Sequence, residues 1–149
     1  MDPLLHKINP PSLVYYNDLE EYRRHYIEKY VKGNIITFDR LRVRFAIDRF
    51  NHAFYKASIP NLSHKDLFDQ DRAERIDWIE YALVSGYAEV YIKSTDHKRR
   101  LHILLDTYIV VLNIQGKKRD RAFFITAYVA DSEAHVNKLK TNRCIYRPK

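Results

Sequence analysis

Two hydroxyl-bearing side chains, Thr126 and Tyr128, stand two residues apart in the stretch 121–131, which reads RAFFITAYVAD. The stretch is rich in aromatic and β-branched residues and has no Gly or Pro, so it is predicted to be a strand in the middle of a sheet. The two hydroxyls would either bond to neighbours in a half-buried strand or donate hydrogen bonds to a bound anion. Because side chains alternate between the faces of a strand, we expect two sets: Phe123, Ile125, Ala127 and Val129 toward the core, and Phe124, Thr126 and Tyr128 away from it.

Two further polar residues lie on predicted helices and could act in the same site. His52 lies opposite the apolar stripe of a helix predicted over 46–57, so it is either a surface histidine or a functional one. Arg75 lies on one of two apolar faces of a longer helix predicted over 69–85. A buried, unpaired charge is costly. Arg75 is therefore expected either to have an acidic partner or to face a pocket that binds an anion.

Motifs typical of metal enzymes or nucleotide-dependent enzymes are absent. Three glycines are too few for a Gly-rich phosphate loop, and neither His-Glu-x-x-His nor Gly-x-Ser-x-Gly occurs. The seven histidines lack metal-ligand spacing, and the one cysteine, Cys144, excludes an internal disulfide and a thiolate zinc site. If the protein is an enzyme, we expect acid–base chemistry and charge stabilisation with no metal and no cofactor.

The charge balance points to an anionic partner. The 149 residues are enough for one globular domain, and the net charge of +7 with a pI of about 9.4 favours RNA, DNA or an acidic protein. The first residues contain no signal-peptide h-region, and no apolar run approaches the ~18 residues of a membrane span. We therefore expect a soluble cytoplasmic protein with no membrane partner.

The predicted elements place helices before strands. A helix is capped by Asn17 or Asp18 and stops at Gly33, and short strands follow within 35–45. After the helices over 46–57 and 69–85, four strands are expected at 88–93, 101–106, 108–114 and 121–129, and a last helix begins at Asp131 or Ser132. Short connections favour an antiparallel meander. The predicted fold class is α+β, with N-terminal helices packed on a four-stranded antiparallel β-sheet.

Four segments, FNHAFY (50–55), RAERIDWI (72–79), YIVV (108–111) and AFFITAYV (122–129), follow one another at spacings that carry a family resemblance. Together they resemble the phage-borne branch of the barnase–EndoU–colicin–RelE-like (BECR fold) ribonucleases, over roughly residues 36–140. The resemblance implies an N-terminal arm and helix over 1–35 and a ribonuclease domain over 36–149. It also implies a metal-independent endoribonuclease, a toxin-like protein of phage or prophage origin.

The resemblance suggests which residues would act. His52 would be the acid or base, Arg75 would bind the scissile phosphate, and the strand hydroxyls of Thr126 and Tyr128 would donate to phosphate oxygens, with Tyr55 orienting His52 or stacking on a base. The product would carry a 2′,3′-cyclic phosphate. A wider set of cations would contact the RNA: Lys56, Arg72, Lys93, Arg99, Arg100, Lys117, Lys118, Arg119 and Arg121.

Two other interpretations fit the same residues. The protein could be a non-catalytic RNA-binding module, which would bind RNA with strong salt dependence and release no product. It could instead be a basic interaction protein that docks an acidic partner. In a toxin–antitoxin arrangement that partner would be an acidic antitoxin or immunity protein. The RNA target, whether transfer RNA or messenger RNA, is open at this point.

Overall fold

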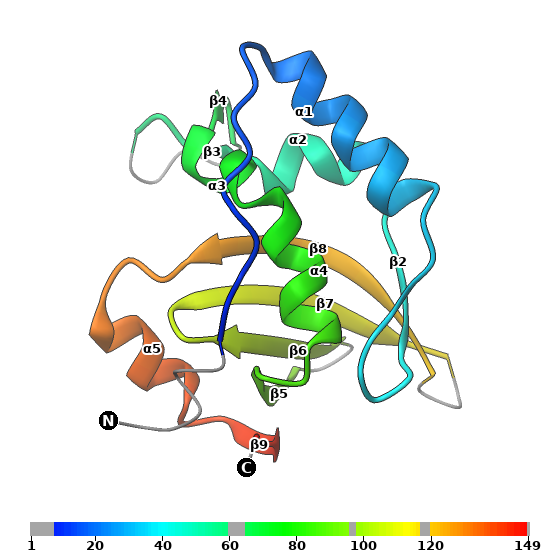
Figure 1. The fold of residues 1–149 in the computed structure, drawn as a ribbon. Coiled ribbons are helices and arrows are strands. Elements are labelled where there is room, and N and C mark those ends of the chain that lie inside the picture. The colour runs from blue at the N-terminus through cyan, green and yellow to red at the C-terminus, as the bar shows by residue number, and fades with distance from the viewer. Residues whose placement is uncertain (1–7, 60–64, 96–97, 117–119, 149) are drawn as a thin grey trace.

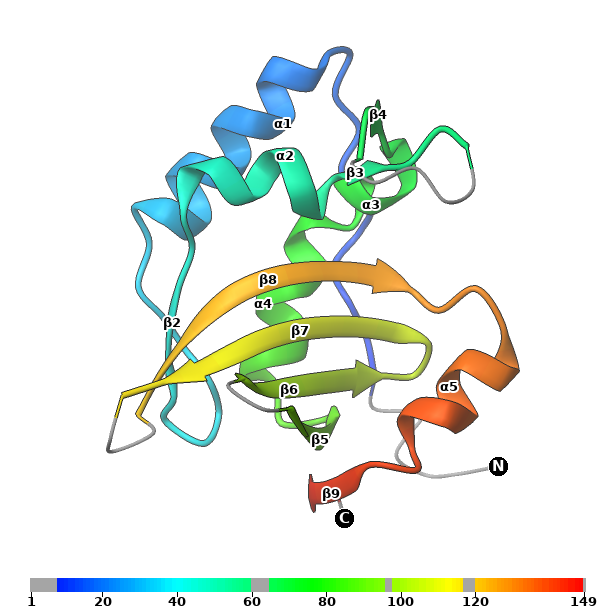
Figure 2. The same ribbon diagram turned by 180° about the vertical axis from the view of Figure 1, so that it is seen from behind.

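The structure is a computed structural model that describes residues 8–59, 65–95, 98–116 and 120–148. It is an α+β fold in which most of the helices lie on one face of a large sheet (Figure 1). The reverse view shows the other face of the sheet, with α4 behind the strands and α5 beside their ends (Figure 2). Within the described ranges, no helix is both long and apolar enough to cross a membrane.

The sheet has seven strands and is mixed, which corrects the prediction of four antiparallel strands. The predicted meander forms its centre as β5 (Glu89–Thr95), β6 (Lys98–Leu105), β7 (Tyr108–Gln115) and β8 (Arg121–Val129). The other strands are short: β9 (Arg143–Tyr146) pairs with β5, β2 (Arg42–Arg44) pairs with β8, and β1 (Ile35–Ile36) pairs with β2. The β2–β8 pair is parallel, and it joins two distant parts of the chain.

The helices are shorter than their sequence patterns predict. Helix α1 (Leu19–Tyr26) begins after its Asp18 cap and continues as a π-helical turn to Val31. The helix predicted over 46–57 is wrong in length: it is a 3₁₀ turn (Ile47–Arg49) and α2 (Phe50–Ala53), followed by the hairpin of β3 (Tyr55–Lys56) and β4 (Leu67–Phe68). The helix predicted over 69–85 breaks at Arg75 into α3 (Gln70–Glu74) and α4 (Ile76–Val84). Helix α5 (Glu133–Leu139) completes the set.

The main core lies between these helices and the sheet, on a side that we call the α4 face. Aromatic rings dominate it: Tyr26 of α1 contacts the rings of Phe45, Phe50 and Phe124 at centroid distances of 5.9–6.4 Å. Since Tyr26 is fully buried among these rings, α1 is part of the same core as the sheet. A smaller cluster, formed by Tyr91, Leu104, Ile109, Val111 and Leu139, lies on the opposite side, the α5 face.

An irregularity in β8 reverses part of the predicted alternation. Thr126 pairs with Val111 and Phe124 pairs with Leu112, so Ile125 is an extra residue in a β-bulge. The prediction that Phe124 points away from the core is wrong, because Phe124 is 1% exposed in the main core. The core positions predicted for Phe123 and Val129 are also wrong. Thr126 and Tyr128 do lie off the main core, beside the α5 face.

The hydroxyl of Tyr30 generates a prediction about stability. This buried group donates to the carbonyl of Ile76 and accepts a hydrogen bond from the amide of Glu80 at 3.1 Å, so it inserts into the backbone ladder of α4. We expect Tyr30→Phe to lower the free energy of unfolding by about 1–3 kcal/mol, because two buried backbone groups lose a partner. Urea unfolding followed by circular dichroism measures this. Tyr108→Phe is the matched control, since its hydroxyl makes one long bond of 3.5 Å; an equal loss in both variants would contradict the explanation.

Candidate active site

A groove on the α5 face contains polar side chains that could act in acid–base chemistry or bind an anion. It lies between the sheet and α5 and encloses about 340 Å³. We call it the α5 groove. Its lining residues come from three strands, from α5 and from the turn after it: Lys93, His102, Tyr128, His135, Lys138, Leu139, Thr141 and Asn142.

Helix α5 is held over the sheet by its cap and its apolar side. The hydroxyl of Ser132 accepts a hydrogen bond from the amide of His135 at 3.1 Å and starts the helix. Leu139, only 7% exposed, and Val136 then pack on the α5 face. This placement brings Nε2 of His135 to 3.1 Å from the hydroxyl of Tyr128, and Nδ1 of His135 to 3.5 Å from a carboxylate oxygen of Asp131.

His102 is held neutral at physiological pH. It stands on β6 beside the smaller core cluster, and neither of its buried ring nitrogens has a hydrogen-bond partner among the described residues. Burial lowers the pKa of His102 to about 4, and the positive charges of Lys93 and Arg100, together with His135, push it in the same direction. A neutral imidazole can accept a proton from a substrate hydroxyl on the ring nitrogen that carries no hydrogen.

Tyr128 is held in its protonated form and connects two groups of charges. Burial raises its pKa, an effect that Arg72 opposes and Asp131 reinforces. On one side its hydroxyl meets His135; on the other, the guanidinium of Arg72 lies 5.3 Å from its ring centroid. Tyr128 is therefore a hydrogen-bond donor at neutral pH, positioned between the α5 groove and the free edge of β8.

Three cations gather at that edge, beyond the short β2 pairing. Arg49 donates from Nη2 to the carbonyl of the bulge residue Ile125 at 2.7 Å, and Nη1 of Arg72 lies 3.5 Å from the hydroxyl of Thr126. Burial lowers the pKa of Lys65, as do the nearby charges of Arg72 and Arg49. Asp69 lies 3.4 Å from Arg72 and offsets part of this charge. The region would favour an anion next to Tyr128.

The structure brings some of the predicted site residues together. Tyr128 and Lys93 line the α5 groove, and Arg100 is close enough to lower the pKa of His102. Thr126 and Arg72 lie at the adjoining edge of β8. Tyr55 presents its carbonyl to Arg72 at 3.5 Å, while its ring packs on Phe50 and Phe68. Among the other predicted cations, Lys56 lies on β3, Arg99 on β6 and Arg121 at the start of β8, and Lys117, Lys118 and Arg119 lie outside the described residues.

The structure does not place His52 or Arg75 in the α5 groove. His52 is exposed on α2, and its described hydrogen bond is through its carbonyl, which accepts from Lys65 at 3.0 Å. Arg75 donates to the carbonyl of Asp71 at 2.9 Å and lies 5.2 Å from the ring of Trp78. Arg75 thus has no acidic partner among the described residues; with Trp78 it lines a separate cavity of about 340 Å³.

Sequence reasoning missed His102, His135 and Lys138. The signal for His102 was present: Arg100 and His102 alternate with Leu101 and Ile103, which places both polar side chains on one face of β6. The sequence does not show that α5 packs over this face of the sheet. His135 lies in the first turn of the helix that Ser132 caps, but the sequence does not show which strand it contacts.

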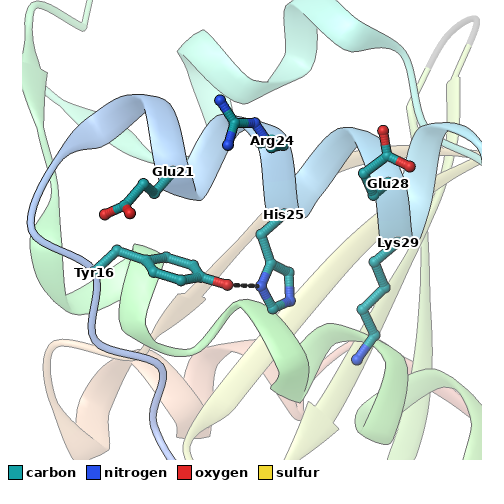
Figure 3. Close-up of a pocket in the computed structure, with 6 residues that line it drawn as sticks. All are labelled: Tyr16, Glu21, Arg24, His25, Glu28 and Lys29. Carbon is teal, nitrogen blue, oxygen red and sulfur yellow. Dashed lines mark hydrogen bonds between the residues drawn. The ribbon is translucent and has the colours of Figure 1, made fainter.

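A second polar pocket lies under α1, where His25 points from the helix to the hydroxyl of Tyr16 (Figure 3). Its Nδ1 is 2.8 Å from that hydroxyl, and its Nε2 is 2.7 Å from Asp77 of α4, which also accepts from Lys29 at 2.9 Å. Burial opposes ionisation of Asp77, but these hydrogen bonds from Lys29 and His25 prevail and lower its pKa. Both nitrogens of His25 are engaged. The network therefore ties the N-terminal arm to α1 and α4, whereas the α5 groove contains His102, whose ring nitrogens have no partner among the described residues.

Comparisons of this chain with models of protein families, with curated proteins and with solved structures found no match. Within the described ranges, no three His, Cys, Asp or Glu side chains come together in a way that could hold a metal ion. The chemistry assigned to the α5 groove therefore rests on the arrangement of its own side chains.

The lowered pKa of His102 predicts a pH-dependent stability. Between pH 6.5, the ordinary pKa of histidine, and about pH 4, the unfolded chain binds a proton at His102 that the folded protein does not, so stability falls as the pH falls through this window. We expect His102→Gln to flatten the decline of the melting temperature between pH 6.5 and 4. Parallel profiles for the two proteins would show that His102 titrates normally.

Proposed function

We propose that the protein is a metal-independent endoribonuclease and that the α5 groove is its active site. The observation that carries the proposal is the combination of a histidine held neutral, His102, with a Tyr128–His135 pair and two lysines in one groove. Cleavage of RNA without metal needs a base, an acid and cations around the phosphate. The groove offers side chains for each of these roles.

His102 is the proposed base. Its neutral ring would take the proton from the ribose 2′-hydroxyl, and the 2′-oxygen would attack the adjacent phosphorus. As the new O2′–P bond forms, the P–O5′ bond breaks, which leaves a 2′,3′-cyclic phosphate on one fragment. DNA has no 2′-hydroxyl and would not be cut by this route.

His135 is the proposed acid, and the remaining groups stabilise charge. A proton on His135 would pass to the departing 5′-oxygen, while Asp131, with a carboxylate oxygen 3.5 Å from Nδ1, would orient the ring. Lys93 and Lys138 would stabilise the phosphorane, and Tyr128, kept protonated by burial, would donate to one of its oxygens. His102 would thus replace His52 as base, and Lys93 would replace Arg75 as phosphate ligand.

The resemblance of four sequence segments to the BECR ribonucleases points to the same function by analogy. In that setting the protein would be a phage or prophage toxin acting on cytoplasmic RNA. An acidic antitoxin that covers the α5 face would be its natural partner, because charge complementarity would steer the two proteins together.

The direct test is cleavage of total cellular RNA in EDTA, with the fragment ends mapped. We expect wild type to give fragments that end in 2′,3′-cyclic phosphate, and His102→Gln to lose at least 100-fold in rate, since acid–base catalysis is typically worth about 10²–10⁴. The same substitution at His52 separates the two histidine assignments. If His52→Gln lost cleavage and His102→Gln kept it, His52 on α2 would be the base.

Intact RNA after incubation with a folded wild-type protein would contradict the ribonuclease assignment. Retained binding in that case would favour the non-catalytic RNA-binding module. The specific observation behind that second candidate is the set of unpaired cations on the α5 face, which would bind RNA whether or not the groove is catalytic.

The pH profile of the reaction gives an independent prediction. Because kcat/KM reports the free enzyme, we expect its acidic limb near pH 4, where His102 of the free protein titrates. A bound phosphate adds negative charge beside the ring and raises the pKa of His102. The acidic limb of kcat, which reports the complex, should therefore lie at a higher pH. Identical limbs in both profiles would argue against His102 as the base.

A further inference from the structure

The sheet register aligns five side chains into one line across the α5 face. Val43, Ala122, Leu112, Leu101 and Ile92 belong to the main core or pack against it, so their strand neighbours project to the opposite face. The register places Arg44 opposite Phe123, Phe123 opposite Asn113, Asn113 opposite Arg100, and Arg100 opposite Lys93. We call this set the cross-strand row: Arg44, Phe123, Asn113, Arg100 and Lys93. It crosses β2, β8, β7, β6 and β5 on the face seen in Figure 2.

The cations of the cross-strand row are not neutralised by the protein. Among the described residues, no carboxylate lies within 4.0 Å of Arg44, Arg100 or Lys93. On the opposite side of the molecule, by contrast, Lys29 has two carboxylate neighbours at 2.9 and 3.6 Å. Arg44, Arg100 and Lys93 therefore keep positive charge that a ligand on this face could neutralise.

Two buried polar atoms of the row also lack a partner. Nε of Arg100 and Oδ1 of Asn113 are inaccessible to solvent, yet neither has a hydrogen-bond partner among the described residues. Buried polar groups are usually paired. These two atoms come from residues that face each other across β6 and β7, so a ligand lying over the row would meet both side chains.

The row also contains an aromatic ring with no evident packing role. Phe123 is partly exposed and belongs to neither hydrophobic cluster of the described residues. It stands between Arg44 on β2 and Asn113 on β7. A flat ring flanked by a cation and an amide is a typical platform for an unpaired base, because every base has a π-face and each phosphate next to it needs a positive charge.

The dimensions of the row fit a short stretch of one strand. Its four steps between neighbouring strands, each about 4.8 Å, give a length of about 19 Å. At a rise of about 3.4 Å per nucleotide in a stacked strand, this holds about five or six nucleotides. The row ends at Lys93, which is also a wall of the α5 groove. A strand that follows the row is therefore delivered to His102 and His135.

We propose that the cross-strand row is the binding track for single-stranded RNA, with phosphates on Arg44, Arg100 and Lys93 and a base stacked on Phe123. The proposal rests on the proposed function, because it defines the substrate of that site as unpaired RNA. A duplex keeps its bases paired and stacked, so it meets the row only through its phosphates. Phe123 is then the residue that discriminates between the two forms.

The test is a binding measurement that does not depend on catalysis. The probe is a fluorescent 12-nucleotide oligouridine with 2′-O-methyl riboses, which blocks attack by the 2′-oxygen and preserves phosphates and bases. Fluorescence anisotropy at several salt concentrations gives Kd and its salt slope. Phe123→Leu removes the ring and Phe123→Tyr keeps it; Arg44→Gln removes one phosphate contact. Arg24→Gln removes the same charge from α1, on the other side of the sheet, and serves as the control. Thermal melting of each variant confirms that it is folded.

We expect Phe123→Leu to weaken binding roughly 5- to 150-fold, the value of one base–aromatic stack. Phe123→Tyr, which keeps the ring, should bind with the affinity of wild type. Arg44→Gln should lower the salt slope by about 0.7, and Arg24→Gln should leave it unchanged. Binding of a 12-base-pair RNA duplex should be insensitive to Phe123→Leu. Affinity should rise with oligonucleotide length up to about six nucleotides and little beyond.

The outcomes separate this proposal from the ribonuclease assignment. Unchanged affinity in folded Phe123→Leu and Arg44→Gln overturns the track, and RNA cleavage by the same proteins would then show that substrate reaches the groove by another path. An equal effect of Phe123→Leu on duplex and single strand overturns the discrimination by stacking. The predicted losses of affinity in a protein that cleaves no RNA would support the track and overturn the ribonuclease assignment.

Discussion

The strand β7 has to be buried on both faces, and this constraint shapes the rest of the molecule. Tyr108, Val110 and Leu112 pack into the main core, while Ile109 and Val111 point to the α5 face and require cover of their own. Helix α5 supplies that cover as far along β7 as Val111. The later β7 side chains on the α5 face, Asn113 and Gln115, are polar. The α5 groove lies at this boundary. Burial at this boundary explains why His102 is desolvated enough to lose its proton.

The bulge at Ile125 has a comparable influence on β8. Without the extra residue, the alternation that buries Phe124 would carry Ala127 to the α5 face and turn Tyr128 into the main core. With it, Ala127 returns to the core and Tyr128 faces His135. The bulge also leaves the carbonyl of Ile125 at a free strand edge, where Arg49 caps it at 2.7 Å. One inserted residue therefore fixes both the donor of the groove and the cation cluster beside it.

Local sequence patterns were enough to predict the meander and the helix starts. Asp18 and Ser132 cap helices because their side chains can satisfy free backbone amides, an interaction that involves only neighbouring residues. The short strands predicted within 35–45 are confirmed as β1 and β2. Strand β9 was missed because four residues carry little periodicity, and the pairing of β9 with β5 and of β2 with β8 depends on distant partners. The sequence did not reveal His102 and His135 as neighbours in one groove for the same reason. The helix face of His52 could be read from the sequence, but the burial that makes His102 unusual depends on α5 folding back over β6.

The charges on the α5 face act on one another, and this coupling links the cross-strand row to the groove. Lys93 and Arg100 belong to the row, and the same two cations lower the pKa of His102. The repulsion among them is a cost that the free protein carries, and a polyanion would relieve it. A phosphate chain that neutralises the row would offset the part of the pKa lowering of His102 that Lys93 and Arg100 cause, while burial, the largest cause, would remain. In the proposed enzyme, substrate binding would thereby raise the basicity of the group that acts on the substrate, so the groove would become reactive when the row is filled.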